Sequence, residues 1–326
     1  MSVLITIVAS FLLTVLLGRW LIPALHALKA GQSIREIGPK WHQVKAGTPT
    51  MGGLMFIAAA LVCVVAAGWT AMLAGTWEQL MVLGFSLIYG AIGFIDDFVK
   101  VKMKRNLGLT ALQKLVLQLA AALAYLALLR WNGNLVSALY IPFVNLSVEL
   151  PWLVYLVFAV FVIVGCVNAV NLTDGVDGLA TGVTLPVMVF FTVVAWAWGS
   201  KTLALFPAAL VGGLAGFLVY NFHPAKVFMG DTGSLFLGGA VCGMAFALDM
   251  PLILILVGII YIVEAVSVMM QVFYFKITHG KRIFRMTPIH HHFEMGGWSE
   301  IKIFSVFTGV TVVMCVLAWL GIMNRF

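Results

Sequence analysis

Ten long apolar segments dominate this sequence and constrain its fold more than any other feature. A helix that crosses a lipid bilayer needs about 17–25 predominantly apolar residues. The chain is 63% hydrophobic and 10% charged, whereas a soluble domain carries about 25% charged residues. The sequence therefore predicts an all-α integral membrane protein of about ten transmembrane helices, with residues 1–326 as a single domain. The expected helices cover residues 4–28, 51–71, 80–98, 112–129, 152–170, 183–198, 203–220, 235–249, 251–275 and 301–323.

The span count is least certain between residues 235 and 275. Only Asp249, Met250 and Pro251 interrupt that stretch, so nine or eleven spans also fit the sequence.

Positive charge is distributed unevenly between the nine loops that these segments define. Of the 19 Lys and Arg residues, 15 lie in or beside the odd-numbered loops. Cytoplasmic loops are enriched in Lys and Arg, so we expect the odd loops to be cytoplasmic and both termini extracytoplasmic. The net charge of +7 then comes from basic loops that orient the chain in the membrane and attract anionic membrane lipids. No nucleic-acid recognition module is evident.

An acidic pair marks the cytoplasmic end of the third segment. Asp96 and Asp97 are adjacent there, and Lys100 follows four positions after Asp96. Two neighbouring carboxylates repel each other and are partly desolvated, so a cation must offset their charge. Neutralisation by the nearby lysines and a functional cation site both fit this pattern.

The fifth loop, at residues 168–178, reads NAVNLTDGVDG. No Lys or Arg occurs between Arg130 and Lys201. Asp174 and Asp177 therefore need a partner from another loop or from a metal ion. The alternative is an ordinary Asn/Asp/Gly turn.

The seventh loop contains FMGDTGS at residues 228–234, directly before an apolar segment. Asp231 or Thr232 could cap the helix that begins there. The free N–H groups of the same helix N-terminus could instead bind an anion.

The ninth loop is long and basic, and it contains PIHHHFE at residues 288–294. Consecutive histidines rarely converge on one zinc ion, so donation to phosphate oxygens is the alternative role. Glu264 lies deep in the preceding segment, where a carboxylate is a candidate functional group by default. Gln271 or water could pair with it.

Four of these motifs lie on loops 3, 5, 7 and 9, all on the same predicted face of the membrane. Unrelated structural features would be expected on both faces. Carboxylates, basic residues, glycines and histidines that converge at one interface suit a site for a metal ion and a diphosphate.

Together the motifs resemble the polyprenyl-phosphate N-acetylhexosamine-1-phosphate transferases. The resemblance rests on Asp96-Asp97 and on residues 168–178, 228–234 and 288–294, and it covers essentially the whole chain. Residues 288–294 and the GTPTMGG segment at 47–53 are most similar to the branch that transfers phospho-N-acetylmuramoyl-pentapeptide.

This resemblance implies a single transmembrane catalytic domain in the bacterial cytoplasmic membrane, with its active site facing the cytoplasm. The implied reaction needs Mg²⁺ and transfers phospho-N-acetylmuramoyl-pentapeptide from UDP-N-acetylmuramoyl-pentapeptide to undecaprenyl phosphate. The products are lipid I and UMP, in the first membrane step of peptidoglycan synthesis. Membrane lipids are further partners, and the oligomeric state is left open, a homodimer included.

The resemblance also implies roles for individual residues. Asp231 is the leading magnesium ligand, and Asp96 and Asp97 are further candidates. Asp96 is expected to orient or deprotonate the lipid phosphate, with Asp97 in support, and Phe228 to stack on uracil. The implied catalytic residues are Asp96, Asp97, Asp231, His290 and His291. The implied substrate-binding residues are Lys45, Thr50, Lys114, Asn168, Asn171, Asp174, Gly175, Asp177, Asn221, Phe228 and Gln271.

Specificity for the pentapeptide requires a long basic loop, because the peptide carries carboxylates. Lys281, Arg282 and Arg285 in the ninth loop fit this role. The main alternative is a sister enzyme that uses UDP-N-acetylglucosamine. A secondary transporter is a distant alternative. Transporters place their polar residues near the midplane of the membrane, whereas the motifs of this chain lie in loops at one membrane face. A non-catalytic lipid-binding scaffold would not need matched carboxylates.

Overall fold

The computed structural model describes residues 3–28, 47–103 and 107–325, and almost all of them lie in helices or in the loops between helices. The first six helices are α1 (Val3–Ala27), α2 (Gly53–Leu73), α3 (Glu78–Met103), α4 (Ala111–Trp131), α5 (Trp152–Thr173) and α6 (Leu179–Ala197). The remaining α-helices are α7 (Leu205–Asn221), α8 (Gly230–Ala247), α9 (Leu254–Val257), α10 (Ile259–Ile277), α11 (Ile289–Glu294) and α12 (Glu300–Ile322). The short 3₁₀ turns are η2 (Pro251–Ile253) and η3 (Met323–Arg325).

Nine of the ten predicted segments each coincide with a single helix of the structure. In the described residues, eight helices have the length and hydropathy to span a membrane, namely α1 to α6, α10 and α12. Helix α7 is apolar but has 17 residues, and α8 carries the polar Asp231 and Thr232 in its first turn. The chain is thus a helical integral membrane protein, and the count of ten spans stays a prediction.

The predicted span 251–275 differs from the structure, because it is not one helix. Helix α8 ends at Ala247, and Pro251 opens a 3₁₀ turn that leads into the single turn α9. Gly258 separates α9 from α10, which begins at Ile259. Proline lacks a backbone N–H, and glycine is a weak helix former, so both residues favour a break here.

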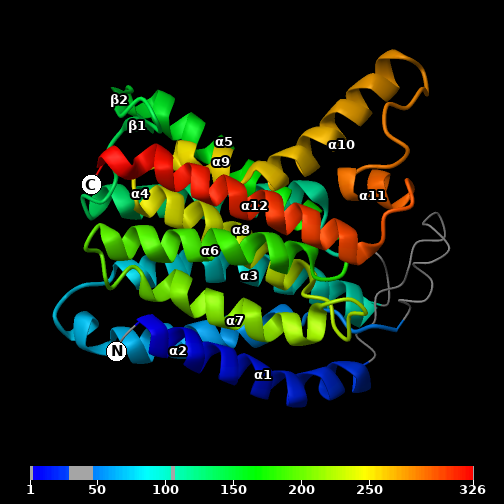
Figure 1. Ribbon diagram of the computed structural model, residues 1–326, viewed down its shortest axis with the longest axis horizontal. Helices are drawn as coiled ribbons and strands as arrows, with labels where there is room; N and C mark the ends of the chain where they lie inside the picture. The colour runs from blue at the N-terminus through cyan, green and yellow to red at the C-terminus, as the bar shows by residue number, and fades with distance from the viewer. Residues whose placement is uncertain (1–2, 29–46, 104–106, 326) are drawn as a thin grey trace.

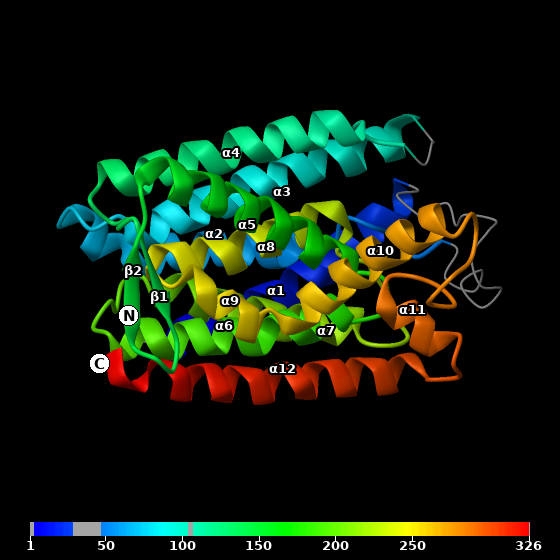
Figure 2. The same ribbon diagram turned by 90° about the horizontal axis from the view of Figure 1, so that it is seen from above.

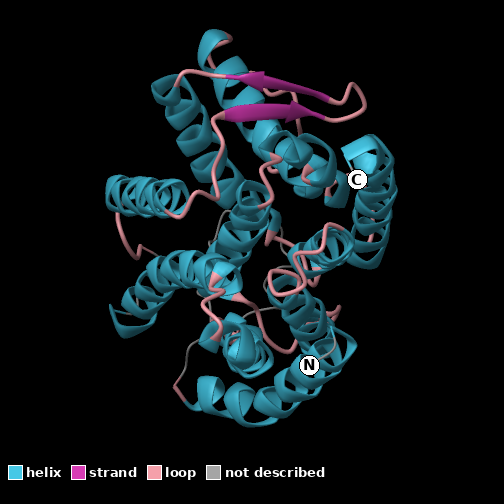
Figure 3. Cartoon of the chain, turned by 90° about the vertical axis from the view of Figure 1, so that its left-hand side faces the viewer, coloured by secondary structure: helices cyan, strands magenta, loops and turns pink. Residues whose placement is uncertain are grey.

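The loops with the polar motifs all lie at one end of the helical bundle. Figures 1 and 2 show that both chain ends lie at the opposite end, which also carries the hairpin of β1 (Ala138–Ile141) and β2 (Leu146–Glu149). The two strands pair in an antiparallel manner and lie across that end of the bundle in Figure 3. The common location of the motifs is therefore confirmed, and which end faces the cytoplasm stays a prediction.

Helix α8 forms the centre of the bundle and is buried on nearly all its faces. A helix that is apolar all round is typical of such a central position. It packs most extensively against α3, and the two helices approach closely at Gly93. A Cβ atom on Gly93 would overlap the backbone carbonyl of Asp231. This contact brings the end of α3 that carries Asp96 and Asp97 beside the start of α8.

Candidate active site

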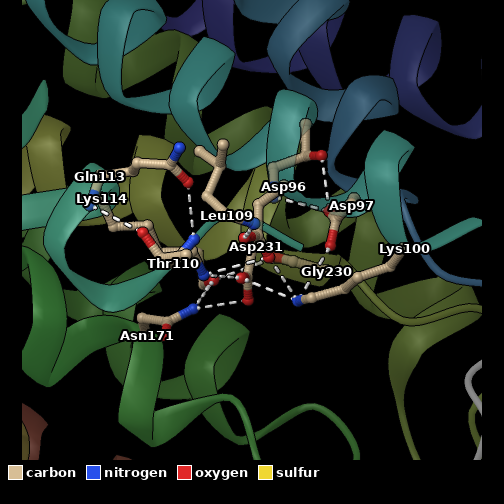
Figure 4. A network of polar contacts seen from close by, with 12 residues as sticks. Asp96, Asp97, Lys100, Leu109, Thr110, Gln113, Lys114, Asn171, Gly230 and Asp231 are labelled. Carbon is tan, nitrogen blue, oxygen red and sulfur yellow. Dashed lines mark hydrogen bonds and ion pairs between the residues drawn. The ribbon is translucent and has the colours of Figure 1, made fainter. Parts of the chain in front are cut away.

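Three carboxylates and two lysines meet at the loop end of the bundle (Figure 4). Helix α3 supplies Asp96, Asp97 and Lys100, α4 supplies Lys114, and α8 supplies Asp231. Asp96 and Lys100 are four residues apart, so both side chains lie on the same face of α3. The three acids therefore come from two helices that are far apart in the sequence.

Asp231 is the point where the two lysines converge. Its Oδ2 lies 2.7 Å from Lys114 Nζ and 3.1 Å from Lys100 Nζ. Its Oδ1 accepts a hydrogen bond from Asn171 Nδ2 at 3.0 Å. The same amide group donates to the Ser234 hydroxyl at 2.8 Å. The first turn of α8 is therefore bound to α3, α4 and α5 through polar contacts.

The prediction that Asp231 or Thr232 caps α8 is wrong. Met229 is the N-cap residue of this helix, and no side chain there makes a capping hydrogen bond. Thr232 instead donates from its backbone N–H and from its hydroxyl to Asp97 Oδ2, at 2.9 and 2.7 Å. The helix N-terminus thus binds an anion, which is the carboxylate of Asp97.

Asp96 is fully buried and uses both of its carboxylate oxygens. Oδ1 accepts a hydrogen bond from the Leu109 backbone N–H at 2.7 Å. Oδ2 lies 2.5 Å from Lys100 Nζ and 3.0 Å from Lys114 Nζ. The predicted neutralisation of the acidic pair by nearby lysines is confirmed, and a lysine from α4 takes part in it.

Helix α4 presents Lys114 from a well-defined N-terminus. Thr110 and Gln113 form a capping box, in which Thr110 Oγ1 accepts from the Gln113 N–H at 3.2 Å. Gln113 Oε1 accepts in return from the Thr110 N–H at 2.9 Å. This arrangement satisfies two of the free donors at the helix start and places Lys114 in the first turn.

The carboxylates of Asp96, Asp97 and Asp231 could together hold a cation. One oxygen from each lies within 4.8 Å of the other two. Mg²⁺ prefers oxygen ligands and is commonly bound by one or two carboxylates together with substrate phosphates. Three carboxylates face two ammonium groups here, so negative charge remains in excess, and this donor set fits Mg²⁺.

The loop between α5 and α6 borders this cluster. Desolvation by the surrounding protein raises the pKa of Asp174, and the negative charges of Asp231, Asp97 and Asp177 raise it further. This coupling through charge shows that Asp174 belongs to the electrostatic surroundings of the carboxylate cluster.

Asp177 takes its partners from two other parts of the chain. Its Oδ2 accepts from the Ala225 backbone N–H at 3.0 Å and lies 3.0 Å from His223 Nδ1. Its own N–H donates to Glu300 Oε2 at 3.0 Å. The expectation that this acid needs a partner from another loop is confirmed. Ligand atoms of Asp177, His223 and Glu300 also lie within 4.8 Å of one another.

The three consecutive histidines face three different partners. His290 Nδ1 lies 3.0 Å from Glu264 Oε2, and His291 Nδ1 lies 2.6 Å from Glu294 Oε2. His292 Nδ1 accepts from the Arg285 backbone N–H at 3.1 Å. The rings therefore do not converge on one metal ion, in agreement with the expectation for consecutive histidines.

The segments before α2 and α8 are joined through their backbones. The Phe228 N–H donates to the Pro49 carbonyl at 2.9 Å, and the Gly52 N–H donates to the Phe228 carbonyl at 2.8 Å. Thr50 is buried beside Gly230, and its hydroxyl has no partner within the described residues. Phe228 is half-buried, and the predicted contact Lys45 lies outside the described residues.

Three further residues with a predicted role in substrate binding make hydrogen bonds within the protein. Asn168 pairs with Gln118 at 2.8 Å, and the buried Asn221 accepts from the Thr181 hydroxyl at 2.8 Å. Gln271 accepts from the backbone N–H groups of Ile283 and Phe284 at 3.1 and 2.9 Å. The structure thus assigns these side chains to internal bonds, and their contact with substrate stays a prediction.

Four residues of the site have no functional role that is evident from the sequence, namely Lys100, Thr232, His223 and Glu300. The i, i+4 spacing between Asp96 and Lys100 was a usable signal. His223 and Asp177 are 46 positions apart, and no local pattern connects them.

The chain is similar to known proteins along nearly its full length. Residues 79–249 match glycosyl transferase family 4, and residues 45–57 match signature 1 of the phospho-N-acetylmuramoyl-pentapeptide-transferases. The protein of that name from Clostridium acetobutylicum is 47% identical over 322 residues, which cover 98% of this chain and 99% of the relative. The Alkaliphilus oremlandii protein of the same name is 49% identical over 330 residues, or 97% of each chain.

Proposed function

Because this chain belongs to the phospho-N-acetylmuramoyl-pentapeptide transferases, we propose that it transfers phospho-N-acetylmuramoyl-pentapeptide from its UDP donor to undecaprenyl phosphate. It is a membrane-integral transferase. The proposed products are lipid I and UMP, and the proposed location is the bacterial inner membrane with the site facing the cytoplasm.

The observation that supports this proposal most is the cluster of three carboxylates and two lysines. Both proposed substrates carry phosphate, one in water and the other anchored in the bilayer. A site at the end of the membrane helices can receive both. The chemical task is to bring two anions together and to stabilise charge on the leaving nucleotide, which requires positioned cations.

We propose Mg²⁺ as the cofactor, with Asp231 as its leading ligand and Asp96 and Asp97 beside it. Bound there, the ion would neutralise negative charge on the diphosphate. Asn171 orients Asp231 through its bond to Oδ1. Lys100 and Lys114 supply further positive charge at the same oxygens.

The contacts of the two neighbouring acids suggest different roles. Asp96 has both oxygens engaged with Leu109, Lys100 and Lys114, so it serves to hold the two lysines. Asp97 Oδ2 is bound by Thr232, while within the described residues Oδ1 has only the 3.9 Å contact with Lys100. Asp97 is therefore the better placed of the two to approach the lipid phosphate, a role that the sequence analysis gave to Asp96.

A cavity beside α10 is suited to the peptide of the donor. It has a volume of about 310 Å³, and its lining includes Gln271 and the cations Lys276, Arg282 and Arg285. Three positive side chains in this cavity match a peptide that carries carboxylates. Lys281, the other predicted contact with the peptide, does not line this cavity.

A UMP-release assay with purified protein and undecaprenyl phosphate tests this proposal. We expect release to depend on Mg²⁺ and to be at least about tenfold faster with the muramoyl-pentapeptide donor than with UDP-N-acetylglucosamine, a difference of about 1.4 kcal/mol. The Arg282→Ala variant should reduce this preference, and Lys281→Ala is the matched control. Equal rates with both donors, or a preference for the unsubstituted sugar, would assign the chain to the sister activity.

A further inference from the structure

Glu264 is a fully buried carboxylate on α10, a helix that is otherwise largely exposed. It belongs to the short inward-facing stripe of Ile260, Tyr261, Glu264 and Ser267. A carboxylate buried inside a membrane segment is costly unless a partner compensates its charge. The partner that the structure provides is His290, and not Gln271.

His290 is also fully buried and contacts Glu264 in two ways. Its Nδ1 lies 3.0 Å from Glu264 Oε2, within ion-pair distance but without hydrogen-bond geometry. Its backbone N–H donates to the same oxygen at 3.4 Å. Figure 2 shows why this is possible, because α11 lies beside α10 at the loop end of the bundle.

The opposite edge of the imidazole faces the loop between α5 and α6. A Cβ atom on Gly175 would overlap His290 Nε2, so only glycine permits this approach. Gly175 itself is exposed, so Nε2 lies directly beneath a surface residue. Within the described residues Nε2 has no hydrogen-bond partner, which leaves it free to bond to a group that enters at this loop.

We infer that Glu264 is a positioning residue that orients His290 for the substrate. The negative charge of a carboxylate favours a proton on the ring nitrogen that faces it, so this contact favours the ring form that carries a proton on Nδ1. Nε2 is then held toward Gly175 and the adjacent Asp174. Carboxylates that orient a functional histidine in this way are common in metal sites and catalytic triads.

This inference rests on the proposed function, in which His290 contacts the substrate. It assigns to Glu264 a role that depends on an acceptor oxygen rather than on volume. Removing one partner of a buried pair can destabilise a protein strongly, so thermal unfolding of each variant is measured beside its activity. The Glu264→Leu and Glu264→Gln variants therefore separate packing from positioning.

The test measures UMP release at saturating and at low donor concentration. Loss of an orienting partner typically costs about 10–100-fold. We expect kcat to fall by about tenfold in Glu264→Gln, which keeps an acceptor oxygen, and by about 100-fold in Glu264→Leu. The donor KM should change by less than about threefold in both variants, because the orienting contact acts on turnover. In a His290→Ala background, Glu264→Gln should have almost no further effect, since the two residues act as one unit.

Ser267→Ala is the matched control, because Ser267 lies on the same buried face and donates to the Glu264 backbone carbonyl without touching its carboxylate. It should keep near-wild-type kcat. An active Glu264→Leu variant, or independent effects of the Glu264 and His290 changes, would overturn the inference.

A second measurement does not depend on activity. In protein labelled with ¹⁵N in the histidine rings, Glu264→Gln should shift the ring resonance that is lost in His290→Ala. If the wild-type protein releases no UMP from either donor, the proposed function fails while this spectrum still decides the inference. An unchanged His290 resonance would overturn the inference alone.

Discussion

The ammonium group of Lys114 lies 2.7 Å from the carboxylate of Asp231, although 117 positions separate the two residues in the chain. Lys114 also lies 3.0 Å from Asp96. One side chain on α4 therefore links the acids of α3 and α8. Because the carboxylates of Asp96 and Asp231 share the ammonium group of Lys114, the position of one relative to the other should depend strongly on this lysine.

The first prediction concerns this lysine. Lys114→Met keeps most of the side-chain volume and removes the charge. We expect kcat to fall by about 100-fold or more, the usual cost of losing one preorganised charged contact in an active site. UMP-release kinetics check this. Lys102→Met is the control, because Lys102 is exposed and lies over the Phe98 ring; equal losses in both variants would contradict the prediction.

The second prediction concerns the proposed magnesium ligand. Asp231→Asn keeps the shape of the side chain and removes its charge. Turnover should be abolished and the Mg²⁺ dependence weakened, with the protein still folded. Asp249→Asn, at the opposite end of the bundle, should remain active. If Asp231→Asn retains more than about a tenth of the wild-type rate, an effect below about 1.4 kcal/mol, the assignment is wrong.

The third prediction concerns the contact between α3 and α8. In Gly93→Ala the new Cβ would overlap the Asp231 backbone carbonyl, so the helices must separate or shift. Overpacking of this kind typically costs about 1–3 kcal/mol. Thermal unfolding and UMP release should both decline. Gly84→Ala on the same helix meets no atom within 4 Å and should be neutral, and similar losses in both variants would show that helix α3 simply requires glycine.

The fourth prediction concerns membrane orientation. The charge bias predicts that the loop end is cytoplasmic, and both chain ends lie at the other end of the bundle (Figure 1). A reporter fused after Arg325 should be extracytoplasmic, and one inserted within residues 281–285 should be cytoplasmic. Two reporters on the same side of the membrane would refute this topology.

Much of the fold could be predicted because a bilayer imposes one requirement on every span. Backbone polar groups have no water to bond in the hydrocarbon region, so apolar segments must form helices. This physical rule is local, and nine of the ten predicted segments each form a single helix. It did not predict the break at Gly258, where the apolar pattern continues although the helix does not.

The candidate site was predictable in part. The residue types Asp96, Asp97 and Asp231 are informative because carboxylates at the ends of apolar helices need a cation. Their partners were harder to identify. The position of Glu264 within an apolar segment marks it as unusual, but the sequence offers Gln271 or water as its partner, whereas His290 is the residue in contact with it.

By itself, the sequence determined that this chain lies in a membrane, that its polar motifs share one face, and to which family it belongs. These properties depend on apolar segments, charge distribution and motifs, which are all read along the chain. Only the tertiary structure decided that Lys114 joins Asp96 to Asp231, that Thr232 binds Asp97, and that Glu264 supports His290. Such contacts depend on how helices pack, since they form between residues that are brought together only when the bundle closes around α8.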